Sequence, residues 1–207
     1  MYDKTILVQI EYPYMRIDTT KDSILRVANQ LFSRFGFQKT SMDEIAKVAR
    51  KAKGSLYYHF TSKEDLFREV VATEMTRLKS QLSTIVCNPD LKASDKIKKY
   101  LITRMEILNS AANYHETLKA DFFEHFHFID DLRTDLDTWE KENLRKIILQ
   151  GVHTGEFTLV AEINILLDMF LMILKGLEIP FFLQNKYEEY SPYFDRLINI
   201  LNKGLAT

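Results

Sequence analysis

The chain of 207 residues contains few of the residues that cross-link proteins or build common catalytic loops. Its one cysteine, Cys87, excludes an intrachain disulfide, and nothing indicates an oxidising compartment. It has only 6 glycines and no glycine-rich phosphate-binding loop. The catalytic patterns G-x-S-x-G and H-E-x-x-H are also missing. These absences argue against an enzyme.

Long uninterrupted apolar runs are missing too. The early run from Ile6 to Ile10 is broken by Gln9, so it does not resemble a signal peptide. The apolar stretch 163–183 contains four residues that argue against a membrane span: Asp168, Lys175, Glu178 and Pro180. We therefore expect a cytoplasmic protein with no membrane partner.

The composition is 46% hydrophobic and 12% aromatic, enough for a sizeable core. The formal charge is −1, so the whole molecule is not a general binder of polyanions. Its distribution is uneven: residues 16–70 contain 11 basic and 7 acidic side chains, whereas residues 71–207 contain 16 and 20. A basic N-terminal module on an acidic body is typical of a regulator that touches DNA at one end.

The most informative stretch is 40–66, TSMDEIAKVARKAKGSLYYHFTSKEDL. It predicts a short helix over 42–49, a tight basic turn over 50–52 and a second short helix over 53–60. Ser62 is placed to cap a third helix. The first helix has a small apolar face made of Ile45, Ala46 and Ala49. This pattern predicts a helix-turn-helix.

The second short helix has one buried face and one polar face. Leu56 and Phe60 lie four residues apart and predict the inward face. The residues left outside can donate hydrogen bonds or allow close backbone approach: Lys53, Gly54, Ser55, Tyr57, Tyr58 and His59. The helix N-terminus also favours an anion. Both features indicate binding to a phosphate backbone.

The segments KGSLYYHF (53–60) and SKEDL (62–66) resemble the signature of the tetracycline-repressor (TetR) family of one-component transcriptional regulators. The preceding Leu31-Phe32, Phe35-Gly36-Phe37 and TSMDEIA (40–46) resemble it as well. The resemblance covers about a quarter of the chain. Beyond Leu66, only the length and the helical pattern are similar.

The resemblance implies roles for individual residues. Lys53, Gly54 and Tyr57 match positions that approach bases in the major groove. Positions that hold phosphates match Thr40, Ser41, Ser55, Tyr58, His59 and Lys63. The turn departs from the family pattern of glycine, apolar residue and serine, because here it reads Arg50-Lys51-Ala52. Either Arg50 takes a strained positive φ, or the turn has another shape.

The resemblance also implies a repressor that binds a palindromic operator in double-stranded DNA as a homodimer and is released by a small-molecule effector. Its last two helices are expected to dimerise through an apolar set: Phe170, Ile173, Leu177, Leu197, Ile198 and Leu201. The alternative is a helical ligand carrier or adaptor without DNA binding. Neither that alternative nor an enzyme explains the outward residues of the second short helix.

The expected fold is all-α: an N-terminal three-helix DNA-binding module followed by a C-terminal helical bundle for effector binding and dimerisation. We assign residues 1–15 to a loosely packed or disordered arm, 16–66 to the DNA-binding module and 67–207 to the bundle. Residue 15 is a second methionine and a possible true start. Further helices are predicted over 20–35, 63–85, 94–110, 114–128, 132–153, 161–183 and 191–203. The helix 161–183 is expected to be buried nearly all round.

The segment 114–128 has the most chemically reactive side chains of the body. Asp121 and His125 lie four residues apart, and Glu124 to His127 spells E-x-x-H. A four-helix di-iron site needs two such motifs, and only one is present, so no metal or cofactor is expected. The other interpretations are ordinary core packing and a pocket for an apolar or amphipathic effector. The candidate pocket residues are Met105, Tyr114, Phe122, His125, Phe126, Trp139, His153 and Met172.

Overall fold

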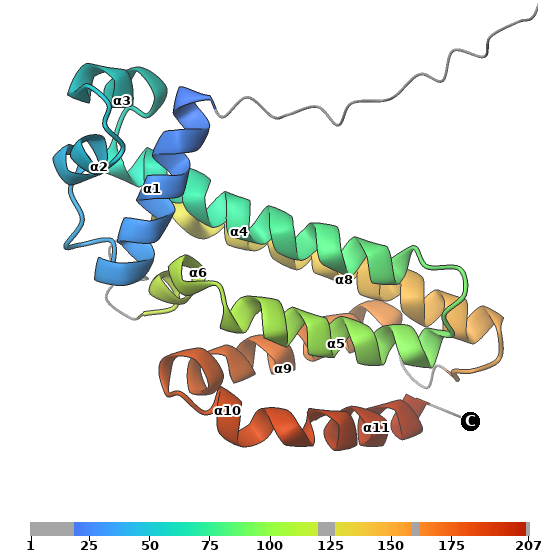
Figure 1. Cartoon of the computed structure of the whole chain (residues 1–207). Helices are drawn as coiled ribbons and strands as arrows, with labels where there is room; N and C mark the ends of the chain where they lie inside the picture. The colour runs from blue at the N-terminus through green and yellow to red at the C-terminus, as the bar shows by residue number, and fades with distance from the viewer. Residues whose placement is uncertain (1–18, 120–126, 159–161, 206–207) are drawn as a thin grey trace, which may run out of the picture.

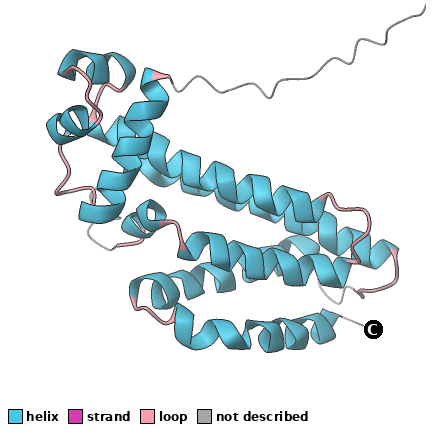
Figure 2. Ribbon diagram, viewed as in Figure 1, coloured by secondary structure: helices cyan, strands magenta, loops and turns pink. Residues whose placement is uncertain are grey.

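The computed structural model describes residues 19–119, 127–158 and 162–205, and every regular element in these ranges is helical (Figures 1 and 2). The predicted all-α class is confirmed. The predicted N-terminal arm, residues 1–15, lies outside the described ranges.

Three short helices form one end of the molecule: α1 (Thr20–Phe35), α2 (Met42–Val48) and α3 (Lys53–His59) (Figure 1). Reciprocal capping boxes start the first two. Thr19 Oγ1 accepts from the Asp22 backbone N–H at 3.2 Å, while Asp22 accepts from the Thr19 N–H. Ser41 and Glu44 repeat this arrangement at α2. The two N-termini are therefore fixed by local sequence.

A single long helix, α4 (Lys63–Val86), joins this end to the body. Ser62 caps it by accepting from the Asp65 backbone N–H at 3.0 Å, as predicted. It packs against α1 at one end and against α5 (Ala93–Asn109) and α8 (Asp130–His153) along its length (Figure 1). Phe67 of α4 lies 5.0 Å from Phe32 and 4.9 Å from Phe37, measured between ring centroids. The core is therefore continuous between the two ends of the molecule.

The helix predicted over 114–128 is wrong. The short α6 (Ala112–Thr117) ends eleven residues earlier, and a 3-10 turn, His127–Ile129, precedes α8. Near the end of α6, Glu116 accepts a hydrogen bond from the Phe37 backbone N–H at 3.3 Å, a contact between residues far apart in sequence. Periodicity contains no information on such a tertiary contact.

The predicted helix 161–183 changes from α to π geometry next to a proline. Helix α9 (Ile163–Glu178) continues into a π-helical turn, Ile179–Leu183, that contains Pro180. Proline has no N–H to donate, and the turn widens so that the Gln184 N–H reaches the Ile179 carbonyl at 3.2 Å. Short α10 (Tyr187–Tyr190) and a 3-10 turn, Ser191–Tyr193, then lead into α11 (Phe194–Leu205).

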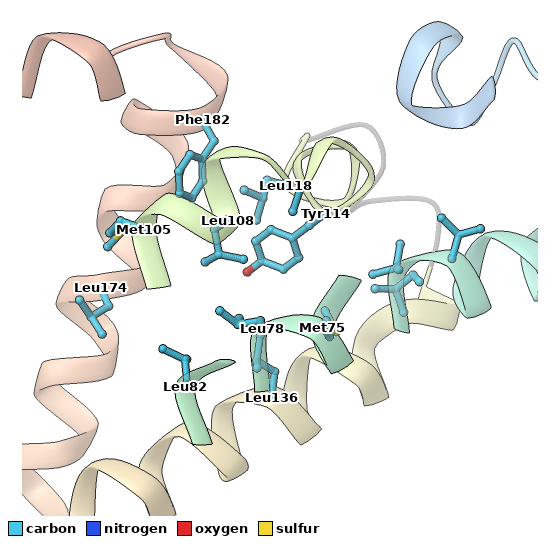
Figure 3. Close-up of a cluster of buried hydrophobic side chains, with 14 of the residues drawn as sticks. Met75, Leu78, Leu82, Met105, Leu108, Tyr114, Leu118, Leu136, Leu174 and Phe182 are labelled. Carbon is cyan, nitrogen blue, oxygen red and sulfur yellow. The ribbon is translucent and has the colours of Figure 1, made fainter. Parts of the chain in front are cut away.

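The body is filled by apolar side chains from α4, α5, α8 and α9 (Figure 3). Leu78 and Leu82 of α4 are fully buried, and Met105 and Leu108 of α5 are nearly so. Each fully buried side chain of this kind contributes about 1.5 to 3 kcal/mol. Helix α11 packs on α5, and α9 packs on α8. Only one face of α9 is covered, so the expectation that it is buried nearly all round is wrong for the single chain.

The turn between α2 and α3 keeps the expected shape without its glycine. Arg50 has φ +52°. Its N–H donates to the Lys47 carbonyl at 3.2 Å, and the Lys51 N–H donates to the Ala46 carbonyl at 3.0 Å. This is the Schellman pattern, which normally places glycine at the left-handed position. The first of the two predicted possibilities, a strained Arg50, is therefore what the structure shows.

Arg50→Gly should raise the free energy of unfolding by about 1 kcal/mol, because glycine carries no left-handed penalty. Lys51→Gly is the control, and it should lower that energy by about 0.5 kcal/mol by freeing the unfolded chain. Urea unfolding followed by circular dichroism measures both. Destabilisation by Arg50→Gly would show that the arginine side chain contributes more than its backbone costs.

Candidate nucleic-acid interface and effector site

Helix α3 has a buried inner face and exposes two tyrosines, Tyr57 and Tyr58, on its outer face. Leu56 is 0% and Phe60 2% exposed, so the predicted inward face is confirmed. Tyr57 is 43% and Tyr58 85% exposed. An exposed aromatic hydroxyl on a short, firmly packed helix is well placed to donate to an external acceptor.

Lys53 at the start of α3 is already paired. Its Nζ lies 2.7 Å from Asp43 Oδ1 of α2, and both side chains are more than half exposed. The hydrogen bond to Asp43, followed by its charge, raises the pKa of Lys53. The Tyr57 ring centroid lies 6.0 Å from the same ammonium group. Lys53 is therefore held as a cation at the outer edge of the module.

The other predicted contact residues of α3 differ in exposure. Gly54 is open: a Cβ built there meets nothing within 4 Å. Ser55 and His59 are half-buried, and the His59 ring lies 5.1 Å from that of Tyr58 in an edge-on contact. The outer surface of α3 is thus formed by Lys53, Gly54, Tyr57 and Tyr58.

Two predicted phosphate ligands have partners inside the protein. Thr40 is 3% exposed, and its hydroxyl donates to the Gly36 carbonyl at 2.9 Å. This corrects its predicted role, because a buried hydroxyl cannot reach a phosphate in this conformation. Lys63 donates to the Phe37 carbonyl at 3.0 Å and lies over the Phe37 ring at 4.3 Å. Ser41, the remaining candidate, is exposed and caps α2.

A polar contact joins α6 to the DNA-binding end. Buried Asn113 donates through Nδ2 to Ser33 Oγ of α1 at 2.9 Å and to Glu74 Oε1 of α4 at 2.8 Å. Glu74 also accepts from the Tyr114 backbone N–H at 2.8 Å. Burial raises the pKa of Glu74, against the opposing hydrogen bonds from Asn113 and Tyr114. Movement of α6 would therefore disturb α1 directly.

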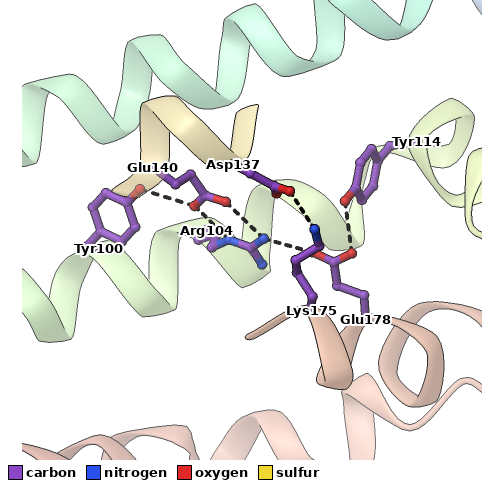
Figure 4. Close-up of polar contacts among 7 residues, drawn as sticks. All are labelled: Tyr100, Arg104, Tyr114, Asp137, Glu140, Lys175 and Glu178. Carbon is purple, nitrogen blue, oxygen red and sulfur yellow. Dashed lines mark hydrogen bonds and ion pairs between the residues drawn. The ribbon is translucent and has the colours of Figure 1, made fainter. Parts of the chain in front are cut away.

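A network of buried charges crosses the middle of the body (Figure 4). Arg104 of α5 donates to Glu140 of α8 through Nε at 2.8 Å and through Nη2 at 3.1 Å. The same Nη2 donates to Glu178 of α9 at 2.8 Å. Tyr100 donates to Glu140 at 3.1 Å, and Tyr114 donates to Glu178 at 2.9 Å. Three body helices are thereby connected to α6.

Burial and charge act in opposite directions on the Arg104 group. Burial alone lowers the pKa of Arg104, but the charges of Glu140 and Glu178 outweigh it and raise the pKa above its ordinary value. Burial, then the nearby Glu178 charge, raises the pKa of Tyr114 far above its ordinary value. The guanidinium is therefore charged and the Tyr114 hydroxyl protonated over the physiological pH range.

The predicted pocket residues do not form one site. Met105 and Tyr114 belong to the core, and Trp139 is half-buried with Lys79 6.0 Å from its ring centroid. His153 is exposed in the last turn of α8, and Met172 is 71% exposed on α9, so neither lies in the core of the single chain. Phe122, His125 and Phe126 lie outside the described residues.

Sequence reasoning missed Arg104, Glu140 and Glu178 as site residues. The signal available was a charged residue on a mostly apolar helix face. Arg104 lies between Leu101 and Leu108 on the buried side of α5. Such positions are ordinarily apolar, because an unpaired buried charge is costly.

The predicted dimer residues divide into exposed and packed groups. Ile173 is 57% and Leu197 47% exposed, whereas Phe170 and Leu177 are half-buried. Ile198 is 5% exposed and packs in the chain's own core, which corrects its assignment. The side chain of Leu201 is outside the described set. The other exposed apolar residues of α9 and α11 are Ile165, Met169, Met172 and Ile200.

Within 19–119, 127–158 and 162–205, no three His, Cys, Asp or Glu side chains gather to hold a metal ion. Asp121, Glu124 and His125 of the metal hypothesis lie outside these ranges, and His127 pairs with Asp130 at 3.1 Å. No helix in the described part of the chain has the length and apolar character needed to cross a membrane.

Fold and site together define a helical protein with an N-terminal helix-turn-helix and a larger helical body. Residues 24–70 match the family described as bacterial regulatory proteins, tetR family. The N-terminal end of the chain, which contains the helix-turn-helix, is therefore similar to this family.

Two relatives and one solved structure illustrate the similarity. The regulator QacR of Staphylococcus aureus is 44% identical over 61 residues, which cover 30% of this chain and 32% of QacR. The uncharacterized regulator YhgD of Bacillus subtilis is 34% identical over 92 residues, which cover 44% of this chain and 47% of YhgD. The match thus spans less than half of either relative. The fatty acid degradation regulator FadR of Bacillus halodurans has a TM-score of 0.72 at 17% identity, covering 90% of this chain and 96% of that one. At this low sequence identity, the structural similarity shows a shared fold alone.

Gly54→Ala should weaken binding to a recognised DNA site by about 1 to 3 kcal/mol, because a methyl group would occupy the space open to a base edge. The folded chain has room for that methyl, so the thermal unfolding temperature should not fall. Fluorescence anisotropy with labelled duplex measures the affinity. Unchanged affinity would remove Gly54 from the contact surface.

Proposed function

We propose that this protein is a DNA-binding transcriptional regulator: a repressor that binds a palindromic operator as a homodimer and is released by a small effector. The observation that carries the proposal is the outer surface of α3. It combines a cation, an open glycine and two exposed tyrosines on a helix whose other side is fully buried. These groups suit contacts to phosphates and base edges.

Support for a homodimer comes from the uncovered face of α9. Ile165, Met169, Met172 and Ile173 are each 57% to 71% exposed and lie at helical spacing. Gly176 continues the same side, and a Cβ built there meets nothing within 4 Å. A contiguous apolar stripe with a small residue suits close packing of a second helix. Two α3 helices are needed to read two half-sites one turn apart.

Support for coupling between effector binding and DNA binding comes from α6, which contacts both the body and the helix-turn-helix end. Tyr114 bonds to Glu178 in the body, and the adjacent Asn113 bonds to Ser33 of α1. An effector that favours another position of α6 would change the orientation of α1 to α3. The effector shifts the DNA-binding equilibrium only by the difference between its affinities for the DNA-binding and the released conformation.

The second candidate function is a helical ligand carrier or adaptor that does not bind DNA. The apolar face of α9 is compatible with it, since a partner other than a second copy can cover such a face. The exposed Tyr57 and Tyr58 are not explained by it. The relatives found are regulators rather than enzymes, so we infer a non-enzymatic role.

Selection of genomic fragments by purified protein at fixed, near-physiological salt tests the proposal. Wild-type protein should enrich one palindrome, and Tyr57→Ala should lose about 1 to 3 kcal/mol of affinity for it. Tyr190→Ala is the matched control, because Tyr190 is 44% exposed against 43% for Tyr57 and lies outside the helix-turn-helix. No enrichment by a folded dimer across a range of salt would favour the carrier or adaptor function.

Met172→Glu should convert a dimer into a monomer, because two copies of the charge would be buried at the proposed α9 interface. Leu149→Glu is the control: Leu149 is a 49% exposed apolar residue on α8. Light scattering after gel filtration measures the mass. A dimeric Met172→Glu protein, or a monomeric wild type, would contradict the proposed interface.

A further inference from the structure

The body buries three charged side chains that packing of the core does not require. The side chains of Arg104 and Glu140 are each 1% exposed, and that of Glu178 is 3% exposed. Removing three charges from water is costly, and apolar residues of similar volume commonly stabilise a core as well or better. Stability alone therefore does not explain this cluster, which points to a second use.

One hydrogen-bond donor of the cluster, Nη1 of Arg104, has no acceptor among the described residues. All four carboxylate oxygens accept: those of Glu140 from Arg104 and Tyr100, and those of Glu178 from Arg104 and Tyr114. Arg104 donates through Nε and Nη2 only. Its Nη1 group is buried, with no acceptor among the described residues. A buried donor without an acceptor costs about 1 to 3 kcal/mol.

We propose that Nη1 of Arg104 is the hydrogen-bond donor for the effector, and that the effector is a neutral, largely apolar molecule with a carbonyl-type oxygen. This inference rests on the proposed function, since it identifies the chemical class of the effector.

The charge of the cluster selects the ligand class. One guanidinium and two carboxylates sum to −1 in the buried region. A ligand carboxylate would bring a further negative charge into that region, while a cationic ligand would face the guanidinium and offer no acceptor to Nη1. The positive charge of the half-buried Arg133 also acts on Tyr114, where it lowers the pKa and so partly opposes Glu178. A neutral acceptor satisfies Nη1 without adding charge.

The side chains around Arg104 indicate that the rest of the effector is apolar. Leu101 and Leu108 lie near Arg104 on the buried face of α5, and Leu171 and Leu174 precede Glu178 on the buried face of α9. Met105 adds an adaptable side chain beside them (Figure 3). Because Tyr114 donates to Glu178, a ligand bound at Arg104 also acts on the start of α6.

Three matched probes test the class by calorimetry: methyl decanoate, decanoate and decyltrimethylammonium. Methyl naphthoate, naphthoate and naphthylmethylammonium repeat the comparison with a compact aromatic shape. In at least one series the neutral ester should bind the full-length wild type about tenfold or more tightly than either charged partner. Equal binding of ester and carboxylate, or preference for the cation, would overturn the proposal. Absence of binding by every probe would also overturn it, and would leave water as the partner of Nη1.

Two variants assign the binding to the cluster. Arg104→Met should abolish ester binding, whereas Lys99→Met, which also replaces a cation by methionine but at an exposed position of α5, should not. Glu178→Gln removes one negative charge with little change in shape, so it should increase carboxylate binding about tenfold. That gain cannot arise from misfolding, and its absence would overturn the charge argument even if Arg104→Met fails to fold.

The DNA selection described above is measured separately. Ester binding by a protein that enriches no DNA would refute the regulator and retain the ligand site. DNA binding without ester binding would refute the ligand class and retain the regulator.

Discussion

The structure depends on the continuous burial of one face of α4. From Leu66 and Phe67 to Leu82, its apolar side chains pack first against the helix-turn-helix and then against the body. A helix of 24 residues is about 36 Å long and resists bending, so a shift at one end is carried to the other. The two ends of the molecule therefore share one core and cannot be treated as independent.

Polar contacts determine how these packed helices are aligned. The apolar core is tolerant of small sliding movements, whereas the Arg104 cluster needs particular distances between α5, α8 and α9. Asn113 imposes a similar requirement between α6 and α1. Both sets of contacts meet at neighbouring residues of α6. The position of α6, a helix of 6 residues, is thus specified by side-chain hydrogen bonds to both ends of the molecule.

The accuracy of the sequence predictions follows the range of the interactions involved. Helices α1, α2 and α4 were predicted within one or two residues, because their caps, Thr19, Ser41 and Ser62, act within a few positions. The helix over 114–128 failed because α6 is fixed by residues about 40 to 80 positions away in sequence. The pocket prediction stays a prediction, because three of its residues lie outside the described ranges. Aromatic and methionine residues on a helical pattern do not reveal which face a neighbouring helix covers, and Met172 is on the uncovered one.

The sequence by itself determined the all-α class, the helix-turn-helix and the outward face of α3, because helical periodicity, caps and the burial of Leu56 and Phe60 are short-range properties. Only the tertiary structure decided that Thr40 is buried, that Lys53 pairs with Asp43 and that Arg104 meets two carboxylates. The partners of Arg104 lie 36 and 74 residues away. A charge so distant in sequence becomes a neighbour only when three helices pack, and packing is a property of the whole chain.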